Sequence, residues 1–166
     1  MNNLVTVISF STTKSDLLIK DCKNLGLNYS IQDTVFIGDW ESNILVKPIL
    51  IRSMLNKHSH ILWVNPHSRI VRSPDRIQMQ VHDIAITKSK AEGDICYKSQ
   101  VDGDIRYNGD IIGMLSNYHT ISFVDDWVRM CKICKSSEEA FNMAIKSSRN
   151  KNLSIKVFSE DYYEYI

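Results

Sequence analysis

Short apolar runs alternate with amphipathic stretches through the first half of the chain. Residues 4–10 are rich in Val, Ile and Thr, a composition typical of a buried strand. Leucines at helical spacing follow over residues 15–25, and Gly26 is a natural helix end. Residues 29–37 predict a second extended segment, which Gly38-Asp39-Trp40 breaks.

The clearest strand signal is the apolar run HILWV at residues 60–64. A helical pattern over residues 47–58 precedes this run. Asn65-Pro66 ends it, because proline cannot donate to a strand ladder. Residues 68–71 then resume a short extended run. We therefore expect a helix, a buried strand and a turn, in this order.

The second half of the chain contains more turns and two clear helical patterns. Residues 122–135 carry apolar side chains at helical spacing. A second helix is expected over 136–148, beginning with the capping-box spacing Ser136-x-x-Glu139. The remaining expected segments are extended runs at 79–87 and 153–158, a polar loop at 88–94, a turn-rich region punctuated by Gly103, Gly109 and Gly113, and an aromatic tail at 161–165.

The alternation of strands and helices favours an α/β fold, with a mainly parallel mixed sheet flanked by helices. A length of 166 residues suits one domain, so residues 1–166 are expected to form a single Rossmann-like unit. The sequence contains no Gly-rich phosphate loop of the dinucleotide or P-loop type, and no nucleophile elbow.

Composition excludes two broad classes. Hydrophobic residues make up 43% and charged residues 23%, so global disorder is not expected. The formal charge is +1, which leaves no broad basic surface for nucleic acid. A local basic patch stays open, because five cations are close in sequence: Lys47, Arg52, Arg69, Arg72 and Arg76.

The thiols and the start of the chain indicate a compartment. No secretory signal and no apolar run of membrane-spanning length is visible, so we expect a cytoplasmic protein without a membrane partner. The cysteines are Cys22, Cys96, Cys131 and Cys134, and we expect them to be reduced. Cys131-x-x-Cys134 is interpreted as two structural thiols on a helix. The alternative is half of a zinc site, which lacks a second pair.

A series of short motifs follows the chain. They are GDWESN at 38–43, KPILIRSML at 47–55, HILWVNPHSRIV at 60–71, Ser73-Pro74, YNGDIIG at 107–113, Trp127, SEEAFNMAI at 137–145 and FSEDYY at 158–163. Their order and spacing resemble those of the small glycosyltransferases of the A-type fold. The resemblance covers most of the chain. It implies a compact glycosyltransferase-A-like domain that uses a nucleoside diphosphate sugar.

The triplet Asn65-Pro66-His67 stands where this family usually carries a metal-binding Asp-x-Asp. Hard divalent cations prefer oxygen ligands, and here only Asn65 offers one, whereas His67 suits softer metals. We therefore expect no ordinary Mg²⁺ or Mn²⁺ site and name no certain cofactor. Either cations such as Lys47, Arg69 and Arg72 replace the metal at the diphosphate, or the site has lost catalysis and retains only binding.

The resemblance also assigns individual residues. Donor binding is expected from Asp39, Trp40, Lys47, Asn65, His67, Arg69, Asn108 and Gly109. Glu138 is the candidate general base for an acceptor hydroxyl, because the capping box already explains Glu139. Asp110 is the second catalytic candidate, in a region where an acceptor hydroxyl would bind. The structural alternatives are a loop-anchoring tryptophan, solvated cations, an Asn-Gly hairpin turn and a solvated acidic loop.

The leading hypothesis is a glycosyltransferase that moves a sugar from a nucleoside diphosphate sugar to an acceptor hydroxyl, with weak or no divalent-metal dependence. An inactive glycosyltransferase-like protein that binds a nucleotide, a sugar or a protein is the alternative, and a compact nucleic-acid-associated factor is a third. The Asn-, Ser-, Lys- and Ile-rich composition suggests a phage or another AT-rich genome. Hydroxymethylated phage DNA is therefore one candidate acceptor, by association rather than from residue chemistry.

Overall fold

The apolar runs of the chain pair into one mixed sheet. In the computed structural model, its described strands lie in the order β2-β1-β3-β6-β5-β7. Their bounds are β1 (Val5–Phe10), β2 (Asn28–Gln32), β3 (His60–Val64), β5 (Ile84–Lys88), β6 (Tyr107–Leu115) and β7 (Ile155–Val157). Strand β1 is parallel to β2 and β3, and β5 is parallel to β7, whereas β6 runs antiparallel to both neighbours. The α/β class with a mixed sheet is thus confirmed.

Helices and a smaller sheet complete the described part of the chain. The structure describes residues 5–11, 15–33, 40–74, 82–88, 107–147, 152–158 and 163–165. Within them the helices are α1 (Ser15–Asn24), α2 (Trp40–Leu55), α3 (Tyr118–Met130) and α4 (Ser137–Lys146). Strand β4 (Ser68–Ile70) pairs with β8 (Tyr163–Tyr165). Among these residues, no helix combines the length and apolar character needed to cross a bilayer.

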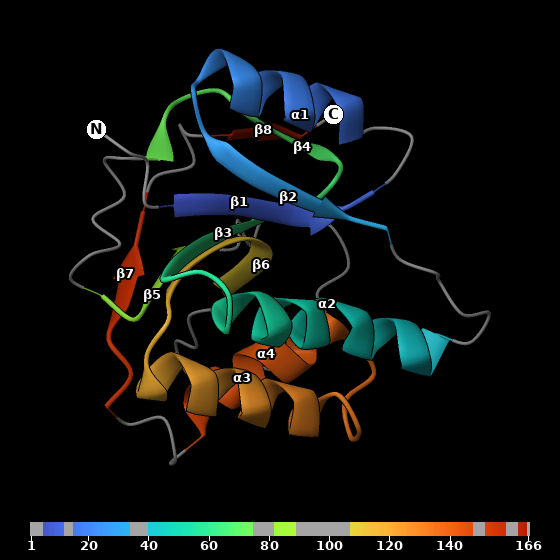
Figure 1. Cartoon of the computed structure of the whole chain (residues 1–166). Coiled ribbons are helices and arrows are strands. Elements are labelled where there is room, and N and C mark those ends of the chain that lie inside the picture. Colours follow the sequence, from blue (N-terminus) through green and yellow to red (C-terminus); the bar gives the residue numbers. More distant parts are fainter. Residues whose placement is uncertain are drawn as a thin grey trace.

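The helices cover both faces of the sheet. Helix α1 and the β4–β8 pair lie on one face, and α2, α3 and α4 form a layer on the other (Figure 1). Successive side chains of β3 point to alternate faces of the sheet. Ile61 and Trp63 belong to the core cluster beneath the three helices, whereas Leu62 and Val64 belong to the cluster beneath α1. Burial on both faces explains why this strand reads as a continuous apolar run.

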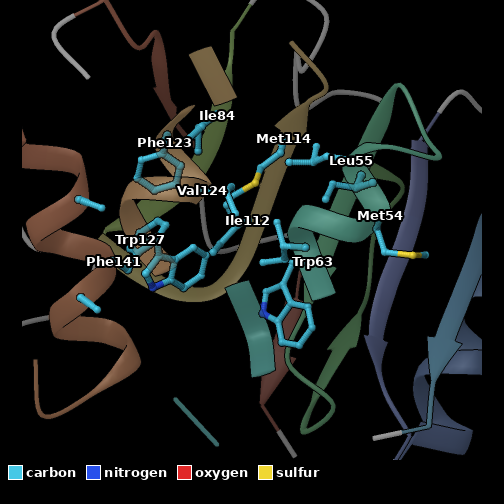
Figure 2. Close-up of a cluster of buried hydrophobic side chains, with 14 of the residues drawn as sticks. Met54, Leu55, Trp63, Ile84, Ile112, Met114, Phe123, Val124, Trp127 and Phe141 are labelled. Carbon is cyan, nitrogen blue, oxygen red and sulfur yellow. The ribbon is translucent and has the colours of Figure 1, made fainter. Parts of the chain in front are cut away.

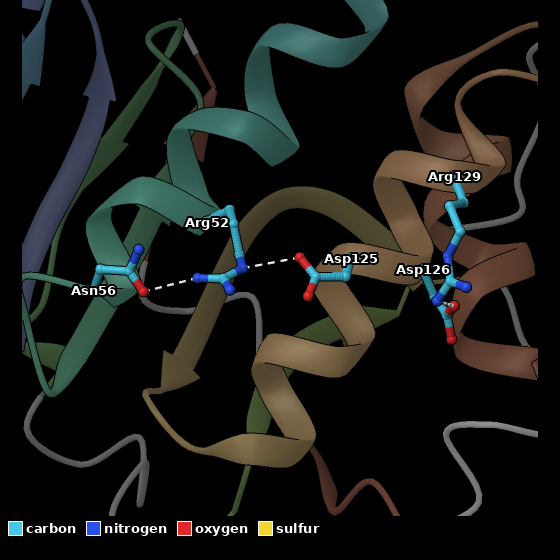
Figure 3. Close-up of polar contacts among 5 residues, drawn as sticks. All are labelled: Arg52, Asn56, Asp125, Asp126 and Arg129. Carbon is cyan, nitrogen blue, oxygen red and sulfur yellow. Dashed lines mark hydrogen bonds and ion pairs between the residues drawn. The ribbon is translucent and has the colours of Figure 1, made fainter.

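The layer beneath α2, α3 and α4 contains the largest buried side chains. Trp127, Phe123 and Phe141 are fully buried, and their rings meet edge-on or tilted, with centroids 4.8–6.2 Å apart (Figure 2). Trp63 joins this layer from the sheet side. At the surface, Arg52 of α2 forms an ion pair with Asp125 of α3 (Figure 3).

Helix α2 begins earlier than the sequence predicts. The expected start at residue 47 placed Pro48 in the first turn, where proline is well tolerated. The structure instead extends the helix back to Trp40, so Pro48 lies inside it. Proline has no N–H to donate to the carbonyl four residues earlier, which belongs to Ile44. The thiol of Cys131 donates to this carbonyl instead, at a sulfur–oxygen distance of 3.8 Å.

Helices α3 and α4 are each capped by a side chain. Helix α3 begins at Tyr118, earlier than expected, because Asn117 accepts the Thr120 N–H at 3.0 Å. The helix ends at Met130, so Cys131 and Cys134 lie in the following turn rather than on the expected helix.

The predicted capping box of α4 is confirmed in part. The hydroxyl of Ser136 accepts the Glu139 N–H at 3.0 Å. The Glu139 carboxylate, however, accepts from the Lys135 N–H, one residue before the expected donor. Predictions for residues 34–39, 75–81 and 89–106 lie outside the described residues, as do residues 161 and 162 of the aromatic tail, whereas residues 163–165 form β8.

Candidate functional site

Polar residues gather at one edge of the sheet, where β3 ends and β6 begins. Parallel neighbours β2 and β3 lie on either side of β1, and the connecting helices α1 and α2 lie on opposite faces. Open α/β sheets bind ligands at such a switch point, outside the carboxyl ends of the strands. The start of antiparallel β6 reaches the same edge, because Val64 pairs with Ile111.

A register shift between β5 and β6 shapes this edge. Ile86 pairs with Ile112, but the next residue, Thr87, pairs with Asn108. Residues 109–111 therefore have no partner in β5, while Ile111 still pairs with Val64 of β3 and the Asp110 carbonyl accepts the Asn65 N–H. Irregularities of this kind redirect side chains next to functional sites. Here the shift sets Gly109 and Asp110 beside the end of β3.

Asn65 and Asp110 are joined by two hydrogen bonds. The Asn65 amide Nδ2 donates to Asp110 Oδ1 at 2.8 Å, and the Asn65 backbone N–H donates to the Asp110 carbonyl at 2.8 Å. Asn65 Oδ1 accepts from the His67 N–H at 3.0 Å, and Asn108 Oδ1 accepts from the Asp110 N–H at 2.8 Å. Both ends of the Asn65 amide are thus engaged, and four of the candidate residues form one network.

Lys47 reaches the same edge from α2. Its ammonium donates to the Gly109 carbonyl. It lies 5.0 Å from the ring centroid of Trp63 and 5.5 Å from that of Trp127, within the range of a cation–π contact. A Cβ at Gly109 would lie only 3.3 Å from this nitrogen, so a larger residue there would displace the ammonium by a few tenths of an ångström.

The environment of Lys47 changes its protonation. Burial lowers the pKa of the ammonium from 10.5 to about 8, since a low dielectric disfavours the charged form. The carboxylates of Asp110 and Glu138 act in the opposite direction. A cation was predicted at this position. The structure places its ammonium next to two indole rings and the Gly109 carbonyl.

Helix α4 presents Glu138 in its first turn. The Glu138 side chain is exposed, and the helix N-terminus favours its negative charge. Asn142, one turn later, fastens α4 to the start of β6. Its Oδ1 accepts from the Tyr107 N–H at 2.9 Å, and its Nδ2 donates to the carbonyls of Tyr107 and Glu138 at 3.1 and 3.0 Å. The Nε1 of Trp127 donates to the Ser137 carbonyl at 3.1 Å, which ties α3 to the same turn.

Other predicted residues lie apart from this network or outside the described residues. Arg69 binds Asp21 of α1 through two hydrogen bonds of 3.1 and 2.9 Å, on the face opposite α2. Arg72 is exposed and lines a small apolar hollow with Phe158 and Tyr163. The imidazole of His67 is exposed. Asp39 lies outside the described residues, and of Trp40 only the backbone is described.

The described residues at this edge do not form an oxygen-rich shell for a hard divalent cation. The only oxygen of the Asn65 side chain already accepts a backbone N–H, and Asp110 is the single carboxylate in the Asn65 network. Within the described residues, no group of three or more His, Cys, Asp or Glu side chains is placed to hold a metal ion. The donor set therefore differs from the oxygen-rich shells that Mg²⁺ and Mn²⁺ prefer.

Sequence reasoning missed two contributors to the site. Trp63 was interpreted only as a strand residue, although it faces the Lys47 ammonium and its Nε1 is a buried N–H without a partner among the described residues. Asn142 was part of a helix motif with no assigned role. A polar residue one turn after Glu138 was the available signal, because positions i and i+4 share a helix face.

Comparisons with known proteins address the fold. No protein-family model matches the sequence, and no curated protein matches it. A solved glycosyltransferase involved in the glycosylation of the major capsid of PBCV-1 is similar over 98% of this chain and 92% of that chain, with a TM-score of 0.65 and 7% identity. A197 from STIV is similar over 98% and 85%, with a TM-score of 0.56 and 10% identity.

A third solved structure supports the same likeness. The apo form of the glycosyltransferase GlyE from Streptococcus pneumoniae TIGR4 has a TM-score of 0.61 and 8% identity. The similarity covers 95% of this chain but 46% of that chain, so the chain spans about half the length of GlyE. The sheet with helices on both faces, which carries the network at its carboxyl edge, therefore has a glycosyltransferase-like fold.

Proposed function

We propose that this protein transfers a sugar from a nucleoside diphosphate sugar to an acceptor hydroxyl, with little or no dependence on a divalent cation. The observation that carries the proposal is the network at the carboxyl edge of β3. There an ammonium, Lys47, and two carboxylates, Asp110 and Glu138, act on one another within a glycosyltransferase-like fold. A lysine with a lowered pKa beside charged partners is typical of functional sites.

The proposed chemistry uses the exposed carboxylate at the start of α4. Glu138 takes the proton of the acceptor hydroxyl while that oxygen forms a bond to the anomeric carbon of the sugar. The bond from this carbon to the diphosphate oxygen breaks, and the nucleoside diphosphate leaves with the electron pair. In this proposal Asn108 and Asp110 bind sugar hydroxyls. The engaged amide of Asn65 supports an arrangement with little help from a metal.

A panel of nucleoside diphosphates tests donor binding. We expect at least one of them to raise the melting temperature without metal, because a ligand that binds only the folded state stabilises it. Addition of Mn²⁺ should change the shift little. Stabilisation that appears only with Mn²⁺ would overturn the metal-independent part of the proposal. No shift with any nucleotide would overturn donor binding itself.

Neighbouring glutamates provide a matched pair for the catalytic assignment. We expect Glu138→Gln to lower donor-dependent transfer about 10²- to 10⁴-fold, the usual contribution of a general base, while the melting temperature stays unchanged. Glu139→Gln should leave transfer unchanged, because the Glu139 side chain binds the Lys135 N–H rather than substrate and glutamine can accept the same hydrogen bond. Equal activity of wild type and Glu138→Gln would rule out Glu138 as the base. Donor binding without transfer by wild type would favour the inactive binding protein.

Two classes of acceptor, DNA and protein, are to be compared. Hydroxymethylated DNA is the candidate that the sequence suggests. The neighbour involved in capsid glycosylation points instead to a protein acceptor. Incubation with a radiolabelled sugar donor and either hydroxymethylated or unmodified DNA tests the DNA acceptor. Label on the modified duplex alone supports the DNA acceptor, and no label on either duplex argues against it.

A further inference from the structure

We propose that Lys47 is a positioning residue, whose enclosed ammonium holds the Gly109 carbonyl and offsets the charges of Asp110 and Glu138, so that the start of β6 is fixed against Asn65. The consequence of this positioning role for sugar transfer rests on the proposed function, whereas the effect of Lys47 on β6 does not. The role differs from the one predicted from the sequence, in which the lysine itself contacts the diphosphate.

The described contacts of the Lys47 ammonium lie on β6, β3 and α3. Among its described neighbours are the Gly109 carbonyl and the rings of Trp63 and Trp127. A lysine has three N–H donors and no acceptor. One of them is bound to the carbonyl, and the indole faces stabilise the charge. In the proposed role, the lysine therefore acts through the strand that it holds.

Gly109 lies in close contact with the Lys47 ammonium. The residue is buried, and an added Cβ would come within 3.3 Å of the Lys47 nitrogen. The adjacent residue, Asp110, carries the carboxylate and the carbonyl that bind Asn65. Since residues 109–111 have no partner in β5, the Lys47 contact supplies part of the hold that a ladder would give.

Charge balance gives the ammonium a second effect. The charged groups that act on it are Asp110 from β6 and Glu138 from α4, whereas β3 and α3 contribute uncharged tryptophans. Without the ammonium, an incoming diphosphate would meet the Asp110 and Glu138 charges with one nearby cation fewer. Like charges repel, and water screens this repulsion only in part at a half-buried group such as Asp110. Protonated Lys47 should therefore favour binding of an anion that it does not touch.

The affinity for a nucleoside diphosphate tests this effect through its pH dependence. For wild type we expect the affinity to fall as pH rises through about 8, where Lys47 loses its proton. Lys47→Met should bind about tenfold more weakly at pH 7, because the ammonium that offsets the Asp110 and Glu138 charges is gone, with no inflection near pH 8. The matched control is Lys57→Met, an exposed lysine just after α2, which should keep the wild-type profile.

Hydrogen exchange tests positioning without any ligand. In Lys47→Met we expect exchange at the Asn65 and Asp110 amides to rise about tenfold, because these amides bind the Asp110 carbonyl and Asn108 Oδ1. Amides of β1 should keep their wild-type rates, which shows that the variant is folded. Gly109→Ala, with the lysine intact but displaced, should loosen the same two amides.

The two experiments separate the possible failures. Unchanged exchange at Asn65 and Asp110 in both variants would overturn the positioning role, whatever the nucleotide result. Faster exchange in a protein that binds no nucleotide would overturn the proposed function and leave the positioning role supported. A wild-type affinity that stays flat between pH 7 and 9 would overturn the electrostatic effect of the ammonium.

Discussion

At the scale of single residues, Lys47 makes a testable contribution to stability. Its pKa is about 8 in the folded protein and 10.5 without the fold. Between these values the unfolded chain binds more protons, so the free energy of unfolding rises with pH, by about 3 kcal/mol in total. Below pH 8 both states hold the proton and the lysine adds no slope. We expect Lys47→Met to lack this rise when urea unfolding is measured from pH 7 to 10.5.

Two buried thiols act in the opposite direction over nearly the same range. Burial raises the pKa of Cys22 and of Cys131 from 9.0 to about 11. The folded state therefore keeps protons that the unfolded chain loses, and stability falls between pH 9 and 11. Both thiols are present in wild type and in Lys47→Met, so the difference between the two curves isolates the lysine. A difference that does not change with pH would contradict the prediction.

Sequence reasoning named the residues of the network better than it named their contacts. Lys47, Asn65, Asn108, Gly109, Asp110 and Glu138 were all chosen from motifs, and the structure brings them to one edge. Their partners depend on the register shift between Ile86 and Thr87, which no local pattern encodes. Arg69 could not be placed from its motif, because its partner Asp21 is 48 residues away on α1.

At the scale of elements, the proline inside α2 is compensated from another helix. Pro48 leaves the Ile44 carbonyl without its helical donor, and the Cys131 thiol just after α3 supplies one. Pro48→Ala restores the N–H and should raise stability, by up to about 3 kcal/mol. The thiol then becomes redundant, so Cys131→Ala should cost less in the Pro48→Ala background than in wild type.

A double-mutant cycle by urea unfolding measures this coupling, which we expect to be about 0.5–1 kcal/mol. Cys134→Ala is the matched control, because its thiol contacts the sulfur of Met143 rather than α2. Its cost should be equal in both backgrounds. If Cys131→Ala also costs the same in both, the thiol does not compensate for the proline.

The layer of α2, α3 and α4 contains both a surface ion pair and a buried aromatic cluster, whose contributions to stability can be compared. The Arg52–Asp125 ion pair joins α2 to α3 with side chains 31% and 50% exposed, so water screens it (Figure 3). We expect Arg52→Ala to lower the free energy of unfolding by less than about 1 kcal/mol. Phe141→Ala removes a fully buried ring from the aromatic cluster and should cost about 3–5 kcal/mol.

Chemical denaturation of both variants, with and without added salt, provides the measurement. Salt should remove what little the Arg52 pair contributes and leave the Phe141 effect unchanged. A larger loss for Arg52→Ala than for Phe141→Ala would show that the helices are held by charge.

Periodicity predicted most elements because their burial is regular. The strand at HILWV was evident, since both its faces are covered. The start of α2 was predicted too late, because Pro48 at a helix start is locally the better choice and only tertiary packing outweighs it. The helix with Trp127 was predicted to begin too late, because the Asn117 cap was not recognised, and it also ends earlier than predicted, at Met130.

At the scale of the whole molecule, the sheet predicts an order of local stability. Strands β1, β3 and β6 are internal and largely buried, whereas β7 lies at an edge of the described sheet with partly exposed side chains. We expect amides of the internal strands to exchange only through global unfolding, and those of β7 to exchange faster through local opening. Hydrogen exchange at increasing urea distinguishes these routes. Equal protection of β7 and β3 would contradict the prediction.

The sequence predicted the class of the fold but not the order of its strands. Alternation of strand and helix predicted the parallel pairs around β1. Insertion of β6 between β3 and β5 depends on a contact between residues about 50 positions apart, and hydrophobic pattern carries no such information. The likeness to solved glycosyltransferases at 7–8% identity shows that the arrangement of the strands persists where almost no sequence identity does.

The enclosure of Lys47 also gives the protein a light-based reporter of its own site. The sequence has three tryptophans, and two of them, Trp63 and Trp127, face the ammonium directly. An excited indole has a larger dipole than its ground state, so a nearby charge shifts its emission. Removal of a single proton from Lys47 therefore changes the field at both rings together. The colour and intensity of the intrinsic emission should then follow the charge of the site in the unlabelled, unmodified protein.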